Sequence, residues 1–186
     1  ATERLVEMIT LKSRRLISEA QEKVNWCSLT GVHSRAYFDA QLPREIAESL
    51  ERSRPLTIAL IDIDGFGRYN KTHGWPTGDR TLRAFGSVAR ANVRATDWVA
   101  RFGGDEFIVV MPDTDLPSAV QVLERVQHAF AATSIESMDG QQLSATLSVG
   151  VAQRAGTPES VEQLVNRASE ALKAIKGQGP NRMQLA

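Results

Sequence analysis

The sequence predicts one α+β domain in which helices wrap a mostly antiparallel central sheet. Its elements follow in the order helix, strand, helices, hairpin, helix, strand, helix, and a hairpin joins its two strands antiparallel. The chain has 186 residues, of which 42% are hydrophobic and 24% charged, as expected for one globular domain with an appendage. These observations favour a single sheet with helices packed on it.

The appendage is a charged segment over residues 2–25, in which apolar residues such as Ile9, Leu16 and Val24 recur at helical spacing. Either this helix packs on its own domain or it connects the domain to a sensor that precedes it. A coiled coil is a further option, although the heptad pattern breaks at Lys12.

The chain begins at Ala1 without a methionine, so we expect either an excised piece of a longer protein or a processed chain. Residues 1–25 then form a signalling connector to an absent sensor domain, and residues 26–186 form the domain itself. The single cysteine, Cys27, cannot form an internal disulfide, which fits a reducing compartment such as the cytoplasm. Zero formal net charge argues against nucleic acid as a partner, and no apolar run approaches the ~20 residues of a membrane span, so we expect no direct membrane contact.

Turn and capping residues delimit the elements in the first half of the domain. Ser34 is a candidate N-cap for a helix that runs to about residue 53. The apolar run 56–62 is expected to be a buried strand, and residues 65–67 a loop. Gly78 is expected to open the next helix.

Similar signals delimit the second half. Asp115 is a candidate N-cap for a helix to about residue 132. A turn at residues 139–140 separates two short strand-like pieces, and the alternating run 144–151 predicts another strand. The last helix is expected over residues 157–177.

The domain is organised around a hairpin over residues 98–111. Gly103 and Gly104 lie at its tip, where paired glycines accept the positive φ angles that a short turn needs. The tip also carries two adjacent carboxylates, Asp105 and Glu106, at the mouth of a buried strand. Adjacent carboxylates repel each other and hold their geometry best around a cation, although an ordinary solvated turn is the alternative for such a tip alone.

A second acidic cluster makes a metal site the better interpretation. The apolar run 57–61 ends in Asp62 and, two residues later, Asp64. Two strands that both end in carboxylates can bring those ends together in one sheet, which creates an oxygen-rich site for Mg²⁺ and substrate phosphates. Such a site suits phosphoryl or nucleotidyl transfer. Asp64 either binds the metal or caps the following loop, and we weigh the two readings equally.

The motif at residues 103–107, together with several spaced motifs between Leu29 and Arg182, closely resembles the GGDEF domain of diguanylate cyclases. The resemblance implies the palm-like fold shared with nucleotidyl cyclases and polymerases. It also implies an enzyme that condenses two GTP molecules into cyclic di-GMP with release of pyrophosphate. Each protomer of a homodimer would hold one GTP, and each 3′-hydroxyl would attack the α-phosphate of the other GTP.

The resemblance further implies Mg²⁺ or Mn²⁺ as the cofactor. The metal ligands would be the carboxylates of Asp62, Asp105 and Glu106 and the backbone oxygen of Ile63. One member of the acidic pair is also expected to help deprotonate the attacking hydroxyl, which makes Asp105 and Glu106 the candidate catalytic residues. We assign that role to Asp105, although the two residues could exchange roles.

The residues that the resemblance assigns to GTP binding are Gly65, Phe66, Gly67, Asn70, Asp79, Gly103 and Lys176. Small residues at 65–67 let backbone N–H groups approach phosphate oxygens. An amide and a carboxylate can pair with the edge of guanine, so Asn70 and Asp79 are the expected base readers, and Lys176 is expected to meet the triphosphate. Taken singly, these three would be a loop residue, a helix-start residue and a cation at a helix C-terminus.

An inhibitory site for the product is implied by Arg94 and Asp97, which form an Arg-x-x-Asp motif five residues before Gly103. Arg125 stands where the family often places a second arginine for cyclic di-GMP. A guanidinium group can donate two parallel hydrogen bonds to a phosphate or to a guanine edge, and a carboxylate can accept hydrogen bonds from the N–H groups of guanine. The alternative is a surface salt bridge, worth ~0–1 kcal/mol.

Several positions depart from the family pattern. Gly67 replaces a usual lysine. Arg68 beside it could supply the lost charge, but we expect its side chain to point elsewhere. Trp75 replaces a usual histidine, and Pro180 replaces an arginine that touches phosphate. Further departures are Cys27, Ser34, Ala36 and Ser169. They support an alternative in which the domain is a catalytically weak or inactive module that binds cyclic di-GMP as a receptor. A weaker alternative is a GTP-binding regulator of a neighbouring phosphodiesterase domain.

Overall fold

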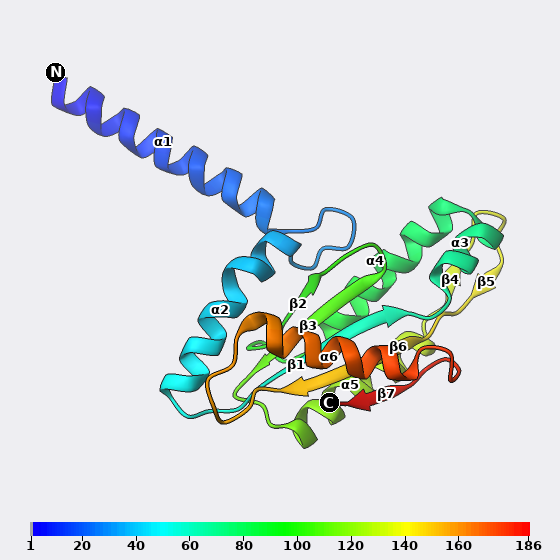
Figure 1. Cartoon of the computed structure of the whole chain (residues 1–186). Coiled ribbons are helices and arrows are strands. Elements are labelled where there is room, and N and C mark those ends of the chain that lie inside the picture. The colour runs from blue at the N-terminus through cyan, green and yellow to red at the C-terminus, as the bar shows by residue number, and fades with distance from the viewer. Residues whose placement is uncertain (1) are drawn as a thin grey trace.

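The computed structural model describes the backbone of residues 2–186 and the side chains of residues 6–20 and 23–186. The strands of the central sheet are β1 (Leu56–Ile63), β2 (Trp98–Arg101), β3 (Glu106–Pro112), β6 (Leu147–Gln153) and β7 (Met183–Leu185). They lie in the order β2-β3-β1-β6-β7, with β7 parallel to β6 and the other neighbours antiparallel (Figure 1). The predicted α+β class with a mostly antiparallel sheet is confirmed.

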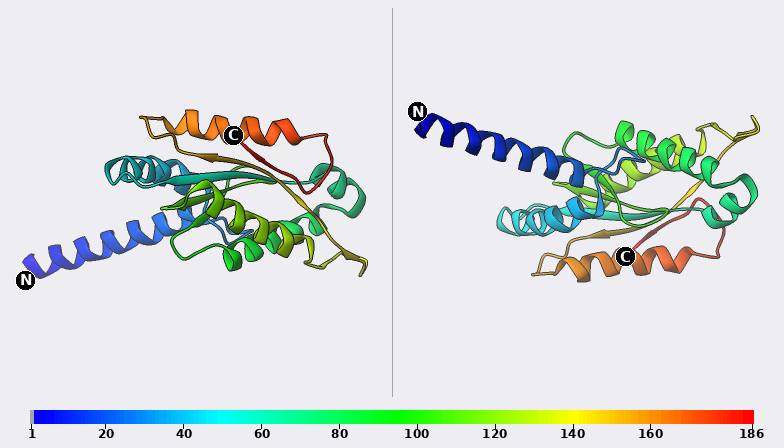
Figure 2. Two further views of the ribbon diagram at one scale, coloured as in Figure 1. Left: turned by 90° about the horizontal axis from the view of Figure 1, so that it is seen from below. Right: turned by 90° about the horizontal axis from the view of Figure 1, so that it is seen from above.

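Helices cover both faces of this sheet. The helices of residues 2–186 are α1 (Thr2–Asn25), α2 (Arg35–Glu51), α3 (Phe66–His73), α4 (Trp75–Asn92), α5 (Leu116–Ala131) and α6 (Val161–Ile175), and α1 is not among those that cover the sheet. The two edge-on views in Figure 2 show α6 on one side of the sheet and α4 and α5 on the other. A separate small hairpin of β4 (Ile135–Glu136) and β5 (Gln142–Leu143) confirms the turn expected at residues 139–140.

Strict alternation along β1 divides the core between these two layers. Ile58 and Leu60 pack with residues of α2 and α6, whereas Ala59 and Ile61 pack with residues of α4 and α5. Successive side chains of a strand point to opposite faces, so Asp62 lies on the face that α6 covers. The buried core thus decides which helix the first acidic residue meets.

The helix starts agree in part with the expectations. Ser34 and Asp115 are N-caps, as predicted, because their side chains accept hydrogen bonds from the backbone N–H groups of Tyr37 and Ser118. The predicted start of the last helix at residue 157 is wrong. Ser160 caps α6 instead, in a capping box with Gln163.

Two further predictions are wrong around the end of β1. The expected loop at residues 65–67 is the start of α3, with Gly65 as its N-cap at φ +65°. Helix α4 begins at Trp75, directly after Gly74 with φ +83°, and not at Gly78. In both cases a single glycine with positive φ makes the turn, and the following residues are already helical.

Near the C-terminus, the expected strand at 144–151 is shifted to β6, and the short strand β7 was not predicted. β7 lies at the sheet edge beside β6, where the N–H of Val149 donates to the carbonyl of Arg182 at 2.8 Å. A strand of three residues has too few positions to show alternation in the sequence.

The amino-terminal helix α1 projects away from the rest of the molecule (Figures 1 and 2). Its exposed large apolar side chains are Val6, Met8, Ile9, Leu11, Leu16, Ile17 and Val24. None of the helices in residues 2–186 combines the length and the apolarity needed to cross a bilayer. That α1 is a connector separate from the domain stays a prediction.

Gly150 gives a test of the packing between α6 and the sheet. A Cβ at this position would lie 2.2 Å from the carbonyl oxygen of Ala168 and 2.4 Å from the backbone nitrogen of Leu172. We expect Gly150→Ala to lower the free energy of unfolding by about 1–3 kcal/mol, since the helix backbone must move. Urea denaturation measures the loss. Gly156→Ala, in open space, is the control and should change stability by less than about 0.5 kcal/mol; equal effects of the two changes would contradict this packing.

Candidate active site

The tip of the β2–β3 hairpin is held by its own hydrogen bonds. The N–H groups of Phe102 and Gly103 donate to the carbonyl of Glu106, at 2.8 and 3.1 Å. The guanidinium of Arg101 donates two bonds to the carbonyl of Gly104, at 3.0 and 2.7 Å. Neither glycine adopts a positive φ, so the expected turn geometry is wrong. The Arg101 bonds and the backbone bonds to Glu106 hold the tip instead.

The acidic cluster forms because the register of β1 and β3 places Asp62 directly opposite Glu106. Directly opposed residues of an antiparallel pair have Cβ atoms about 5 Å apart. Burial raises the pKa of the Asp62 carboxyl, a hydrogen bond from Lys176 acts against this, and the net shift is upward. The negative charges of Asp105 and Glu106 also act to raise it. The structure therefore brings these carboxylates together at one end of the sheet.

Lys176 belongs to the same cluster. It follows α6 as its C-cap, and its Nζ donates to Oδ2 of Asp62 at 3.0 Å. Burial acts to lower the pKa of the Lys176 amine, but the bond to Asp62 and the charges of Glu106 and Asp105 outweigh it, so the pKa is raised. Lys176 is thus more than a cation at a helix end.

The carboxylate oxygens of this cluster are suitable ligands for a hard cation. Among the described side chains, no three His, Cys, Asp or Glu groups already form a metal site. Even so, a divalent cation relieves the repulsion between clustered carboxylates, and oxygen-only ligand sets are those that Mg²⁺ prefers. Ile63 lies beside them at the end of β1, where its N–H donates to the carbonyl of Asp105 at 3.4 Å.

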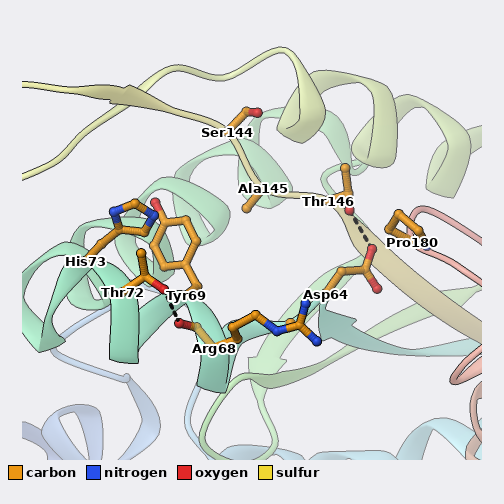
Figure 3. Close-up of a pocket in the computed structure, with 10 residues that line it drawn as sticks. Asp64, Arg68, Tyr69, Thr72, His73, Ser144, Ala145, Thr146 and Pro180 are labelled. Carbon is orange, nitrogen blue, oxygen red and sulfur yellow. Dashed lines mark hydrogen bonds between the residues drawn. The ribbon is translucent and has the colours of Figure 1, made fainter.

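Asp64 has a structural role. One of its carboxylate oxygens accepts from Ser148 Oγ at 2.6 Å. The other accepts from Thr146 Oγ1 at 2.6 Å, a bond drawn in Figure 3, and from the N–H of Asn181 at 2.8 Å. Asp64 thereby ties the end of β1 to β6 and to the segment before β7. The contacts are not made to the segment that directly follows β1, so they do not show the expected loop cap, and metal binding by Asp64 stays a prediction.

A cavity of about 350 Å³ lies between α3, α4 and the hairpin tip. Asn70, Asp79 and Asp105 line it, together with Phe66, Gly67, Trp75, Leu82, Arg101 and Gly104. Asn70 is buried on α3 and packs against Gly78, where a Cβ would lie 1.9 Å from Oδ1. Its Oδ1 has no hydrogen-bond partner among the described residues. The two expected base readers therefore share one cavity with the acidic hairpin.

A second cavity, of about 430 Å³, lies between the start of α3, the end of α6 and the segment that follows α6. Asp62, Gly65, Arg68, Lys176 and Pro180 are among its lining residues. The expectation that Arg68 points elsewhere is therefore wrong. Pro180, the position of a missing arginine, does line this cavity and contributes no charge to it.

The three residues of the expected inhibitory site also lie close together, on the α4–β2 loop and on α5. Oδ2 of Asp97 accepts from the N–H of Arg94 at 2.9 Å, while its Oδ1 is buried without a partner in the described structure. Burial raises the pKa of Asp97, against the bond from Arg94 and the positive charges of Arg94 and Arg125. Within the described residues the side chains of Arg94 and Asp97 form no ion pair, so the salt-bridge alternative does not describe them.

Sequence reasoning missed the residues that support the site. Arg101 braces the hairpin tip and lines the first cavity. Its position two residues before Gly103 was a usable signal, because an arginine there can reach the carbonyl groups of the turn. Ser148 in β6 and Thr146, the residue just before that strand, are two residues apart, but that they face Asp64 depends on a register that the sequence does not display.

The sequence of this chain is similar to those of several known proteins. The family model described as "Diguanylate cyclase, GGDEF domain" matches residues 25–182. The response regulator PleD of Caulobacter vibrioides is 38% identical over 154 residues, which cover 82% of this chain and 34% of that protein. Diguanylate cyclase DosC of Escherichia coli is 33% identical over 179 residues, which cover 96% of this chain and 39% of that protein.

Among solved structures, the coiled coil and GGDEF domain of DgcB from Caulobacter crescentus, in complex with c-di-GMP, superimposes with a TM-score of 0.90. It is 28% identical, and the match covers 98% of this chain and 97% of that one. The chain spans 34% of PleD and 39% of DosC, so it corresponds to one part of those longer proteins. On the family match, these identities and the shared fold, the chain belongs to the GGDEF domain family of diguanylate cyclases.

Proposed function

We propose that this domain is a diguanylate cyclase that condenses two GTP molecules into cyclic di-GMP and pyrophosphate. The observation that carries the proposal is the acidic cluster at one end of the sheet, in which Asp62 is paired with Glu106 and lines one cavity while Asp105 lines another. One cavity holds an amide and a carboxylate suited to a purine edge, and the other holds a lysine suited to phosphates. PleD and DosC are relatives, and the latter is a diguanylate cyclase by name. Because GTP is the substrate, the domain acts in the cytoplasm.

Base recognition rests on Asn70 and Asp79. With Oδ1 of Asn70 turned against Gly78, the amide N–H₂ is the group left to donate to the O6 carbonyl of guanine. Asp79 accepts from the N1–H and the N2 amine of the same edge. Adenine presents a donor where guanine has O6 and an acceptor where guanine has N1–H, so both contacts would be lost.

Asp62, Asp105, Glu106 and the backbone oxygen of Ile63 would hold Mg²⁺ or Mn²⁺, which neutralises charge on the triphosphate when bound. Lys176 stays close enough to share Asp62 and to meet a phosphate oxygen. Asp105 lines the base cavity and accepts the proton of the attacking 3′-hydroxyl, with Glu106 as the alternative base.

Catalysis across a dimer follows from the stoichiometry of the reaction. Each protomer holds one GTP, and two nucleotides must be aligned for each 3′-hydroxyl to reach the other α-phosphate. The projecting helix α1, with exposed apolar side chains along its length, is proposed as the element that sets this alignment. The match to the coiled coil and GGDEF domain of DgcB covers 98% of this chain, which supports a paired α1.

Product inhibition is proposed at Arg94, Asp97 and Arg125. Asp97 is 7% exposed and keeps one oxygen without a partner, so a guanine N–H can satisfy it. The same site would serve the second candidate function, a receptor for cyclic di-GMP with weak or no catalysis. The uncharged Pro180 in the phosphate cavity favours that second candidate.

The acidic pair gives the first test of the proposal. We expect Asp105→Ala with Glu106→Ala to lower cyclic di-GMP formation from GTP and Mg²⁺ at least about 100-fold, because metal and proton acceptor are lost together. Chromatography of the nucleotides measures turnover, and the melting temperature verifies the fold. Glu124→Gln, an exposed acidic residue on α5, is the control. An active double variant would exclude the assignment of these residues, and a folded, dimeric wild type without product would favour the receptor.

Base selectivity gives the second test. Asp79→Asn replaces a carboxylate, which accepts at both oxygens, with an amide that has one acceptor and one donor group. We therefore expect about tenfold to 100-fold weaker GTP binding and little change in the weak binding of ATP. Calorimetry with both nucleotides measures the ratio. Asp39→Asn, exposed on α2, should leave the ratio unchanged. An undiminished preference for GTP in the Asp79 variant would contradict its role as a base reader.

The inhibitory site gives the third test. We expect Arg94→Ala to weaken cyclic di-GMP binding by at least about tenfold, since a guanidinium contact to phosphate or guanine is removed. Calorimetry on the variant and on Arg83→Ala, an exposed arginine of α4, compares equal losses of charge. Equal affinities in wild type and the Arg94 variant would refute the site.

A further inference from the structure

Arg68 occupies a position shared by two cavities. The 430 Å³ cavity beside Lys176 and a third cavity, of about 470 Å³, have Asp64, Gly65, Arg68 and Pro180 in common. Figure 3 shows the third cavity, with the Arg68 side chain extending toward Asp64 and away from His73. The guanidinium of this exposed residue therefore lies on the wall between the two hollows.

The other charged groups around this wall already have partners. Lys176 donates to Asp62, and Asp64 accepts from Thr146, Ser148 and Asn181. Arg68, in contrast, makes no side-chain hydrogen bond and no ion pair with the rest of the described chain. A guanidinium offers five N–H donors in a planar fork that matches phosphate oxygens.

The backbone around Arg68 adds to this donor set. The first helical bond of α3 runs from the N–H of Tyr69 to the carbonyl of Gly65, at 2.9 Å. The N–H groups of Phe66, Gly67 and Arg68 therefore have no partner within the helix, and such groups bind anions. Arg68 combines a free side chain with the positive end of α3, next to the cavity that holds Lys176.

We infer that Arg68 is a phosphate-binding residue of this domain, which contacts the terminal phosphates of GTP. The inference rests on the proposed function and adds a residue to it. Lys176 is already balanced by Asp62, and Pro180 brings no charge. Among the described residues that line this cavity, Arg68 is the cation that has no partner of its own to share with a triphosphate. Arg68 supplies that cation from α3.

The test compares a triphosphate with a monophosphate. The probes are α,β-methylene GTP, which cannot be cyclised, and GMP, both with Mg²⁺ and measured by calorimetry on the full chain. Arg68→Gln should weaken the triphosphate about tenfold to 100-fold and leave GMP within about twofold. Arg68→Lys should restore part of the loss. Lys71→Gln removes the same charge from the same helix at an exposed position, and should bind both probes like wild type.

Each outcome is decisive. If wild type binds the triphosphate and Arg68→Gln binds it equally well, the Arg68 assignment is overturned while the proposed function stands. If Arg68→Gln weakens GMP as much as the triphosphate, or lowers the melting temperature, Arg68 supports the fold and the assignment is also overturned. If wild type binds neither nucleotide, the proposed function fails, and this inference fails with it.

Discussion

The opposition of Asp62 and Glu106 across β1 and β3 is the constraint on which the rest of the site depends. Two carboxylates on one face of adjacent strands repel each other, and burial adds to the cost of ionising Asp62. One lysine, Lys176 at the end of α6, partly compensates this negative charge. Because Gly150 lets α6 approach the sheet closely, Lys176 reaches Asp62 at 3.0 Å. The site thus keeps an excess of negative charge, which a bound cation would neutralise.

A short run of contacts joins α1 to this site. Trp26 stacks on His33 with ring centroids 4.1 Å apart, and His33 stacks on Tyr37 at 3.7 Å. The backbone of His33 bonds to β2, accepting from the N–H of Arg101 at 2.8 Å. Arg101 in turn holds the carbonyl of Gly104 at the hairpin tip. Packed rings and backbone bonds thus connect the end of α1 to β2 and to the hairpin tip.

Local signals predicted much of this structure, and distant contacts account for the rest. The α+β class, the N-caps Ser34 and Asp115 and the acidic hairpin follow from periodicity and capping chemistry that a few adjacent residues display. The start of α3 could not be predicted from such local signals. Gly65 and Gly67 have low helix propensity, and the burial of Phe66 decides the conformation. The partners of Asp64 lie 82 to 117 residues away in the chain, so no local pattern could reveal them.

The segment after α6 shows why single departures from a family pattern are weak evidence of lost function. Gly177, Gly179 and Asn181 all have positive φ, and the N–H of Asn181 donates to Asp64. Backbone geometry and one half-buried carboxylate thus shape this segment, and Pro180 with its restricted φ fits a tightly turned path. The segment can keep its position on the cavity wall without a charged side chain. The charge that a phosphate requires then has to come from the opposite wall, where α3 presents Arg68.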